Sequence, residues 1–172
     1  MTAIKDLTIV NPGEGRSVRL GLGFGVDFKF MGAHTDGAVA VVEHSFAPGA
    51  WVPPHVHTRE DEYSIVIEGE IGFGSGSQEV TLGPGGYITK PRNELHAMWN
   101  AGPAPARMIE IISPAGFELY FEEAAELFLS ADGAPDPQDL AALADRYGLT
   151  FDFTRAPELI ERYGLTPRPQ PR

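Results

Sequence analysis

The sequence predicts a single all-β domain, built as a small barrel or sandwich and followed by helices. Its 172 residues include 20 glycines and 15 prolines, a composition that favours many turns between short strands. Between residues 17 and 113, short apolar or β-branched segments alternate with these turn residues, as antiparallel strands do. A chain of this length is long enough for one domain with a substantial core and too short to expect two.

The first strands are expected between residues 17 and 46. The segments SVRLGLGF, VDFKFMG and AVAVVEHSF are rich in apolar or β-branched residues and bounded by Gly, Asp or Pro, so they predict three or four strands. Pro53 and Pro54 then precede His55. Because proline cannot donate a hydrogen bond to a neighbouring strand, this segment predicts an edge or bulged strand.

The middle of the chain predicts strands in pairs. EYSIVIEGEIGFGSGS indicates two strands folded over residues 68–70, and EVTLGPGGYITKP indicates another hairpin. LHAMWNAG and ARMIEIIS then complete a barrel. Short antiparallel strands at this spacing are typical of a sandwich or jelly roll, and the mouth of such a small barrel can hold one ligand.

Three helices are predicted after the strands. In FELYFEEAAELFLS the apolar residues recur at nearly helical spacing, at Phe117, Phe121, Ala124 and Phe128. This helix is expected to pack on the barrel. Asp136 is the predicted cap of PQDLAALADRY, and Thr154 that of RAPELIERY. Both of these helices end in RYGLT, in which the glycine can take the left-handed conformation while the leucine packs back.

The domain boundaries follow from these elements. We expect residues 1–130 to form the barrel domain with its following helix, and residues 131–172 to be a C-terminal helical extension of the same domain. No low-complexity block or charge run before residue 130 indicates a linker. The last residues, PRPQPR, are expected to be disordered.

Composition excludes several classes of function. A formal charge of −11 argues against binding to nucleic-acid phosphates or an anionic membrane, both of which need clustered Lys and Arg. The absence of cysteine excludes disulfides and thiolate metal sites and suits a reducing compartment. No basic region with a long apolar run begins the chain, so a cytoplasmic protein is predicted. Gly-rich phosphate loops and GxSxG or HExxH motifs are missing from the sequence.

Three histidines and one glutamate make the strongest candidate site. His55 and His57 are two residues apart, so an extended strand places both imidazoles on one face, with backbones roughly 6.6 Å apart. Glu62 follows at an interval long enough for a turn and a return strand, and His96 would close the set. Three imidazoles and a carboxylate suit one divalent transition metal ion (Fe, Mn, Ni, Co, Cu or Zn) and leave coordination positions open for a substrate.

These residues also carry a family resemblance. The first cupin motif is matched at Gly49, His55, His57, Glu62 and Gly69. The second is matched at Gly85, Pro91, His96 and Asn100. Asn93 stands where the second motif usually has glycine, and asparagine tolerates a positive φ better than most residues do. The chain thus resembles the small single-domain cupins of the quercetin dioxygenase-like group.

The resemblance implies a fold, a cofactor and a range of functions. It implies a double-stranded β-helix, or jelly-roll barrel, with C-terminal helices packed outside, a metal ion inside and a homodimer. Glu62 would both bind the metal and act as a base on a substrate hydroxyl. A dioxygenase that opens a flavonol or another enolic or phenolic small molecule would follow. A non-oxidative isomerase or lyase, or a non-catalytic small-molecule-binding cupin, remains the alternative because one barrel hosts many chemistries.

An apolar vestibule is expected beside the metal. Met98 shares a face with His96, and Trp51 has the parity of His55 if the strand is not bulged. Phe73, Tyr87 and Phe30 are weaker candidates, and for all five a place in the core is the more common role.

Several polar residues are further candidates for this site. Glu43 and Glu110 lie in otherwise apolar strands, so each is either a hydrogen-bond acceptor for a ligand imidazole or exposed on an outer face. Arg92 could hold an anionic substrate group at the rim. His34 and His44 are predicted to be structural or surface residues.

Overall fold

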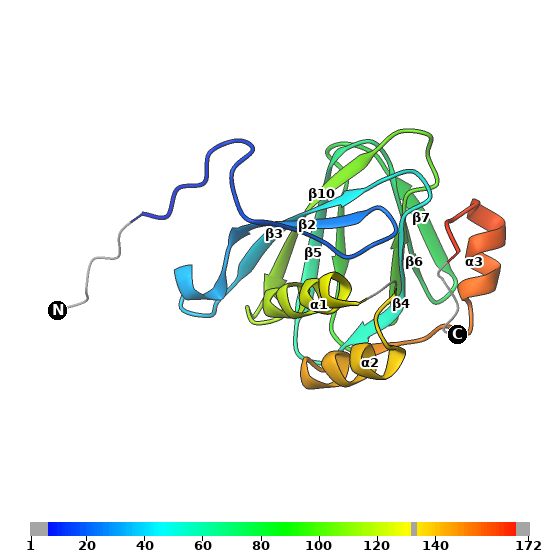
Figure 1. Cartoon of the computed structure of the whole chain (residues 1–172). Helices are drawn as coiled ribbons and strands as arrows, with labels where there is room; N and C mark the ends of the chain where they lie inside the picture. The colour runs from blue at the N-terminus through cyan, green and yellow to red at the C-terminus, as the bar shows by residue number, and fades with distance from the viewer. Residues whose placement is uncertain (1–6, 132–133, 168–172) are drawn as a thin grey trace.

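Two antiparallel sheets face each other in the computed structural model of the chain, which describes residues 7–131 and 134–167 (Figure 1). One sheet has the order β1 (Ser17–Arg19), β2 (Phe24–Phe30), β3 (Ala40–Phe46), β10 (Ala106–Ser113), β5 (Asp61–Glu68) and β8 (Tyr87–Lys90). The other has the order β11 (Leu149–Phe151), β4 (Trp51–His57), β9 (His96–Trp99), β6 (Ile71–Ser75) and β7 (Gln78–Leu82). The predicted all-β jelly-roll barrel is confirmed.

From β3 to β10, every connection between consecutive strands except that of β6 with β7 crosses from one sheet to the other, and these crossings close the barrel. The predicted hairpin over EVTLGPGGYITKP is wrong, because β7 pairs with β6 while β8 pairs with β5 in the opposite sheet. The turn predicted over residues 68–70 is present, but it too leads from β5 in one sheet to β6 in the other. Gly69 is required there: its φ is 66°, and a Cβ would lie 2.6 Å from the carbonyl oxygen of Pro105.

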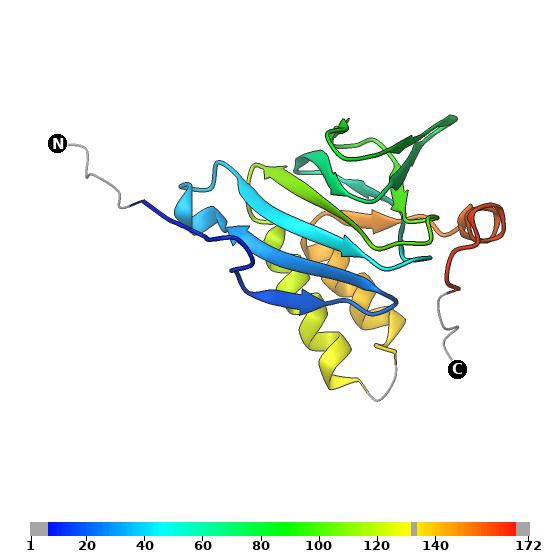
Figure 2. The ribbon, with the colours of Figure 1, turned by 90° about the horizontal axis from the view of Figure 1, so that it is seen from above.

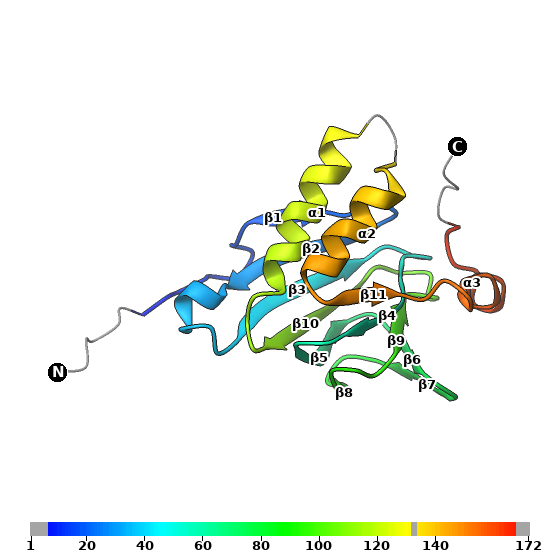
Figure 3. The same ribbon diagram turned by 90° about the horizontal axis from the view of Figure 1, so that it is seen from below.

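The predicted helices cover an open side of the barrel or pack beside it. Figure 3 shows α1 (Glu118–Ser130) and α2 (Pro137–Arg146) side by side across β1, β2 and β3. Figure 2 shows the same pair in yellow and orange, beneath the blue strands. Phe121 and Ala124 of α1 are buried in the main core together with Phe24 of β2. The third helix, α3 (Ala156–Tyr163), packs on a separate cluster around Trp51 and Trp99.

Local sequence signals explain how these helices begin and end. Asp136 caps α2 as predicted, its side chain accepting a hydrogen bond from the Gln138 amide at 2.8 Å. The prediction of Thr154 as a cap is wrong: α3 begins after Arg155, and the Thr154 amide instead bonds the Asp152 carboxylate in a preceding turn. Both helix stops are confirmed. Gly148 and Gly164 have φ values of 68° and 63°.

One short strand was not predicted, and it completes the sheet next to the candidate ligands. In β11, Leu149 pairs with His57 and Phe151 with His55. The strand therefore covers the free edge of β4 over the segment that carries both histidines. Three residues are too few for an alternation pattern to reveal. Among the described residues, no helix is long and apolar enough to cross a bilayer. The disorder expected in PRPQPR concerns mostly residues 168–172, which lie outside the described residues.

The turn before β9 holds Asn93 in the left-handed conformation, which asparagine tolerates better than most residues do. Asn93 has a φ of 65°, and its amide donates a 2.7 Å hydrogen bond to the carbonyl of His57. This bond joins the turn before His96 to the strand that carries the other two histidines. The left-handed conformation of Asn93 therefore helps to set the distance between His96 and the two histidines of β4.

We expect Asn93→Val to destabilise the fold and Asn93→Gly to be neutral. A β-branched side chain at positive φ costs about 1–2 kcal/mol, which lowers the melting temperature of a domain of this size by roughly 2–8 °C. Thermal unfolding followed by circular dichroism measures the shift. If the valine and glycine variants melted at the same temperature, the strain assigned to this turn would be absent.

Candidate metal centre

Four buried side chains from both sheets converge inside the barrel. His55 and His57 lie on β4, His96 lies on β9 of the same sheet, and Glu62 lies on β5 of the opposite sheet. One ligand atom from each lies within 4.8 Å of the others, and no side chain of the four is more than 4% exposed. Nε2 of His57 is 3.5 Å from Oε1 of Glu62, and Nε2 of His96 is 3.3 Å from Oε2. The structure thus brings the whole predicted set together.

A bulge in β4 sets the direction of the two β4 histidines. Val52 pairs with Met98 and His55 pairs with His96, so β4 has one more residue than β9 over this interval. The extra residue falls at Pro53 and Pro54, where a bulged strand was predicted. As a result, Val52 rather than Trp51 faces the same cavity as His55.

Hydrogen bonds hold the imidazole rings in place. Nδ1 of His55 lies 2.7 Å from the carbonyl oxygen of Pro53, and Nδ1 of His96 lies 3.0 Å from that of Glu94. When Nδ1 carries the proton for such a bond, the lone pair is on Nε2, the atom that faces Glu62 in His96. His57 differs, since its Nδ1 lies 3.6 Å from a carboxylate oxygen of the buried Glu60. This separation is too long for a hydrogen bond, and neither of the two atoms has a hydrogen-bond partner among the described residues.

The charges of the four groups fit a cation. Burial lowers the pKa of His55 well below its ordinary value and also lowers the pKa of His96, which keeps both rings neutral and able to donate lone pairs. Burial alone would raise the pKa of Glu62, but His57 and Lys90 outweigh it and hold that pKa well below the ordinary value. Nε2 of His96 is buried without a hydrogen-bond partner among the described residues. Three nitrogen donors and one carboxylate could therefore hold a metal ion here.

A buried polar array continues from Glu62 along the inner face of the six-stranded sheet. Nζ of Lys90 lies 2.9 Å from Oε2 of Glu62 and donates a 2.6 Å hydrogen bond to Oε2 of Glu110. The hydroxyl of Ser64 also donates to Glu110. Nε2 of His44 lies 4.0 Å from the same carboxylate. Burial raises the pKa of Glu110 to about 7 against the opposing effect of Lys90, and burial lowers that of His44 to about 3.

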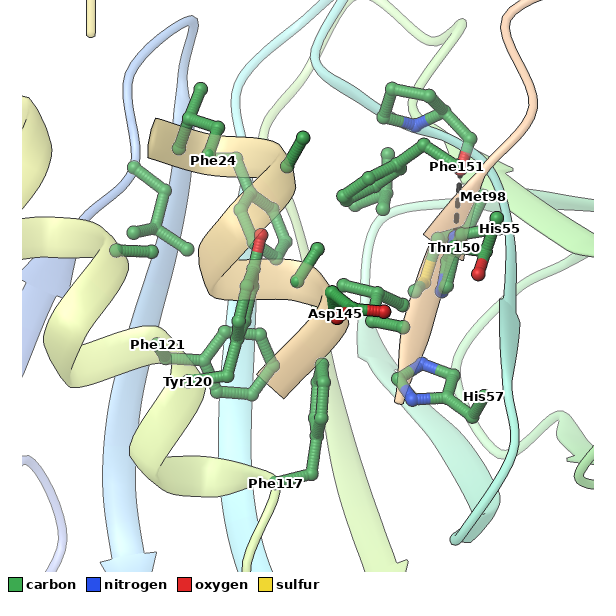
Figure 4. A pocket seen from close by; sticks show the side chains of 18 of the residues that line it. Phe24, His55, His57, Met98, Phe117, Tyr120, Phe121, Asp145, Thr150 and Phe151 are labelled. Atoms are coloured by element: carbon green, nitrogen blue, oxygen red, sulfur yellow. Dashed lines mark hydrogen bonds between the residues drawn. The ribbon is translucent and has the colours of Figure 1, made fainter. Parts of the chain in front are cut away.

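An apolar cavity of about 440 Å³ opens beside the four converging side chains. Three of the four, His55, His57 and Glu62, belong to its lining. Its aromatic lining residues include Phe24, Phe117, Tyr120, Phe121, Phe128 and Phe151. Figure 4 shows the two β4 histidines and Phe151 on one side of the cavity, and Phe24 and Phe121 on the other. The barrel therefore supplies the candidate ligands, and the C-terminal segment supplies much of the apolar wall.

The predicted pocket residues have different places in the structure. Met98 lines the cavity. Trp51 does not, because the bulge turns it into the cluster beneath α3, where its indole N–H donates to the carbonyl of Thr166. Phe73 is buried in the main core, and Tyr87 is 73% exposed on β8, so both lie outside the cavity lining. Phe30 is half-buried and likewise outside it.

The remaining polar candidates lie in different parts of the structure. Glu110 is fully buried, but it reaches the ligands through Lys90 rather than through an imidazole. Glu43 lies on the outer face, where it pairs with Arg107. Arg92 forms an exposed ion pair with Asp61 at 2.8 Å. His34 is exposed, as predicted.

Sequence reasoning missed Glu60, Lys90 and the position of His44. His44 lines the cavity, with its ring centroid 5.3 Å from that of Phe121. Lys90 pairs with Glu62 across β8 and β5 and therefore shares its inward face, which only the register of these two strands reveals. His44 likewise shares the inward parity of Val42 and Phe46. Glu60 lies in a loop, where no periodic pattern applies.

The comparisons with known proteins point to one family. A family profile described as "Cupin domain" matches residues 42–112, a range that contains all four converging residues. Germin-like protein 1-1 of Oryza sativa subsp. japonica is 33% identical over 69% of this chain and 55% of its own length. Quercetin 2,3-dioxygenase of Bacillus subtilis (strain 168) is 27% identical over 51% of this chain and 26% of its own length. The chain therefore spans about half, or less, of these relatives.

The solved structures agree on the fold. An RmlC-like cupin from Shewanella frigidimarina has a TM-score of 0.57 and 21% identity, over 66% of this chain and 96% of that one. At this identity the likeness concerns the architecture alone. The helices α1 and α2, which border the cavity, lie outside the range that the cupin profile matches.

We expect Glu60→Gln to weaken metal binding without unfolding the chain. Loss of the carboxylate beside Nδ1 of His57 removes the group that fixes this ring, and such outer partners are worth roughly 10- to 100-fold in metal affinity. Competition with a chromophoric chelator measures the affinity for Zn(II) or Co(II). Glu94→Gln is the matched control, since the Glu94 side chain bonds Ser75 and only its backbone contacts a ligand. Equal affinities for E60Q and the wild type would contradict this role.

Proposed function

Because the chain belongs to the cupin superfamily, we propose that it is a metal-dependent dioxygenase acting on a small enolic or phenolic substrate of the flavonol type. His55, His57, Glu62 and His96 would hold one divalent transition metal ion. The observation that carries the proposal is the combination of this donor set with an aromatic cavity directly beside it. The similarity to a quercetin 2,3-dioxygenase supports the same reaction class.

The cavity favours a flat, mainly apolar molecule. Its volume of about 440 Å³ is within the range of roughly 300–1,000 Å³ usual for small-molecule sites. Phenyl rings such as those of Phe117 and Phe121 pack well against another aromatic system. Few polar groups line the cavity beyond the candidate ligands, notably His44, Asp145 and Thr150. An oxygen at one end of the substrate would then face the metal centre while its rings occupy the apolar part.

Glu62 is the proposed catalytic residue. A bound cation would supply acidity, lowering the pKa of a hydroxyl that coordinates it. Glu62 can then accept the hydroxyl proton even though His57 and Lys90 favour its ionised form. The apolar lining excludes bulk water from the reacting oxygen, and Met98 with Val52 borders the space next to His55.

The two alternatives make different demands on the site. A non-oxidative isomerase or lyase for sugar-like substrates needs many hydrogen-bonding groups to replace the water around hydroxyls. The aromatic lining provides few of them. A non-catalytic cupin would bind the same apolar molecules as the proposed enzyme, and only turnover separates the two.

The test is oxygen uptake by metal-reconstituted protein. Metal-depleted chain is loaded separately with Fe(II), Mn(II), Co(II), Ni(II), Cu(II) and Zn(II), then supplied with flavonols, catechols and β-diketones. We expect at least one ion to support oxygen consumption that matches the loss of substrate absorbance. His57→Ala should reduce this to background while circular dichroism stays native-like. His34→Ala, which removes an exposed histidine, should leave it unchanged.

Two results would contradict the dioxygenase. Turnover of a substrate in the absence of oxygen would point to the isomerase or lyase instead. Tight binding of a flavonol to every loaded form, with no turnover in any, would point to a binding protein.

A further inference from the structure

A lysine is buried between two carboxylates at the edge of the candidate metal centre. Lys90 lies directly opposite Glu62 in the pairing of β5 with β8, and it is 3% exposed. Its Nζ is 2.9 Å from Oε2 of Glu62 and 2.6 Å from Oε2 of Glu110. The ammonium also lies 3.9 Å from the sulfur of Met98. The positive charge is therefore directed at an oxygen of the proposed carboxylate ligand.

Stability does not account for this arrangement. A buried ion pair loses so much hydration that apolar residues of similar volume usually stabilise a core at least as well. On β5 and β10, the strands that carry the two carboxylates, the neighbouring inward side chains are Val66, Met108 and Ile112. The sheet therefore accepts apolar residues at such positions. What an apolar residue at position 90 could not provide is a charge against Oε2 of Glu62.

The two oxygens of Glu62 have different surroundings. Oε1 lies 3.5 Å from Nε2 of His57, and no lysine among residues 7–131 and 134–167 forms an ion pair with it. Oε2 lies 3.3 Å from Nε2 of His96 and 2.9 Å from Nζ of Lys90, so a metal ion at this oxygen would compete with the lysine for it. On its other side the lysine donates a hydrogen bond to Glu110. Glu110 is itself held by a hydrogen bond that it accepts from the hydroxyl of Ser64.

Building on the proposed metal centre, we propose that Lys90 is a positioning residue that limits Glu62 to one oxygen, Oε1, as a metal ligand. A carboxylate that binds through one oxygen occupies one coordination position fewer than one that chelates. The position left open is available to a substrate oxygen. The nearby ammonium also repels a dication and so lowers the metal affinity of the site. Lys90 would therefore leave a coordination position open to substrate and weaken metal binding at the same time.

Cobalt(II) provides a test that does not depend on turnover. Four forms are loaded with one equivalent of Co(II): the wild type, Glu110→Gln, Lys90→Met, and the double variant K90M/E110Q. The double variant removes the lysine and the charge of its buried partner together, which guards against a single variant that fails to fold. E110Q keeps the lysine beside Glu62 and is the matched control. Visible absorption reports coordination number, and chelator competition reports affinity.

We expect the wild type and E110Q to share one spectrum. K90M/E110Q should show weaker visible bands, because a chelating Glu62 raises the coordination number. It should also bind Co(II) roughly tenfold or more tightly than E110Q, because these two forms differ only in the repelling charge of Lys90. An unchanged spectrum with equal or weaker affinity in the double variant would overturn the role of Lys90 and leave the metal centre standing. Failure of the wild type to bind Co(II) would instead overturn the metal centre itself.

Discussion

Burial of a carboxylate among three imidazoles, inside an apolar barrel, is the constraint on which the rest of this structure depends. Such a charge is costly unless it is paired, and each ligand atom faces the others rather than water. With Glu62 and Glu110 both ionised, the two carboxylates and the ammonium of Lys90 leave one negative charge inside the six-stranded sheet. A divalent cation at the four side chains would compensate it. The same ion would bridge the two sheets, because β4 and β9 belong to one and β5 to the other.

The site is assembled from two separate parts of the chain. Residues 55–96 supply every proposed ligand, from strands that belong to both sheets. Much of the cavity wall comes from residues 117–153, through α1, α2 and β11. Phe117 joins the two parts, since its ring lies 4.3 Å from that of His57 and 5.2 Å from that of Phe121. The barrel thus carries the candidate ligands, and the C-terminal segment forms much of the apolar wall beside them.

Much of this could be predicted from the sequence, for identifiable physical reasons. The spacing of His55, His57, Glu62 and His96 predicted their convergence, and helix signals such as Asp136 and Gly148 predicted the ends of elements correctly. The face of Trp51 was not predictable with certainty, because a bulge of one residue reverses the parity of everything before it.

Sheet membership and the cavity were beyond the reach of local patterns. The segment around β7 and β8 has the composition of a hairpin, yet its two strands belong to opposite sheets, which only the closure of the barrel decides. Lys90 resembles an ordinary surface lysine until its pairing with Glu62 is known. The cavity depends on how α1 and α2 lie across the sheet, and their amphipathic pattern does not specify a partner face.

X-ray absorption at the metal edge tests the central claim most directly. Protein is purified without added metal, and the ion that it carries, or one equivalent of Co(II) supplied afterwards, is measured in the wild type. We expect the nearest scatterers to be three imidazole nitrogens together with oxygen, with the multiple scattering that imidazole rings produce. Oxygen scatterers alone, without imidazole scattering, would show that the ion is bound elsewhere and that the four side chains are not its ligands.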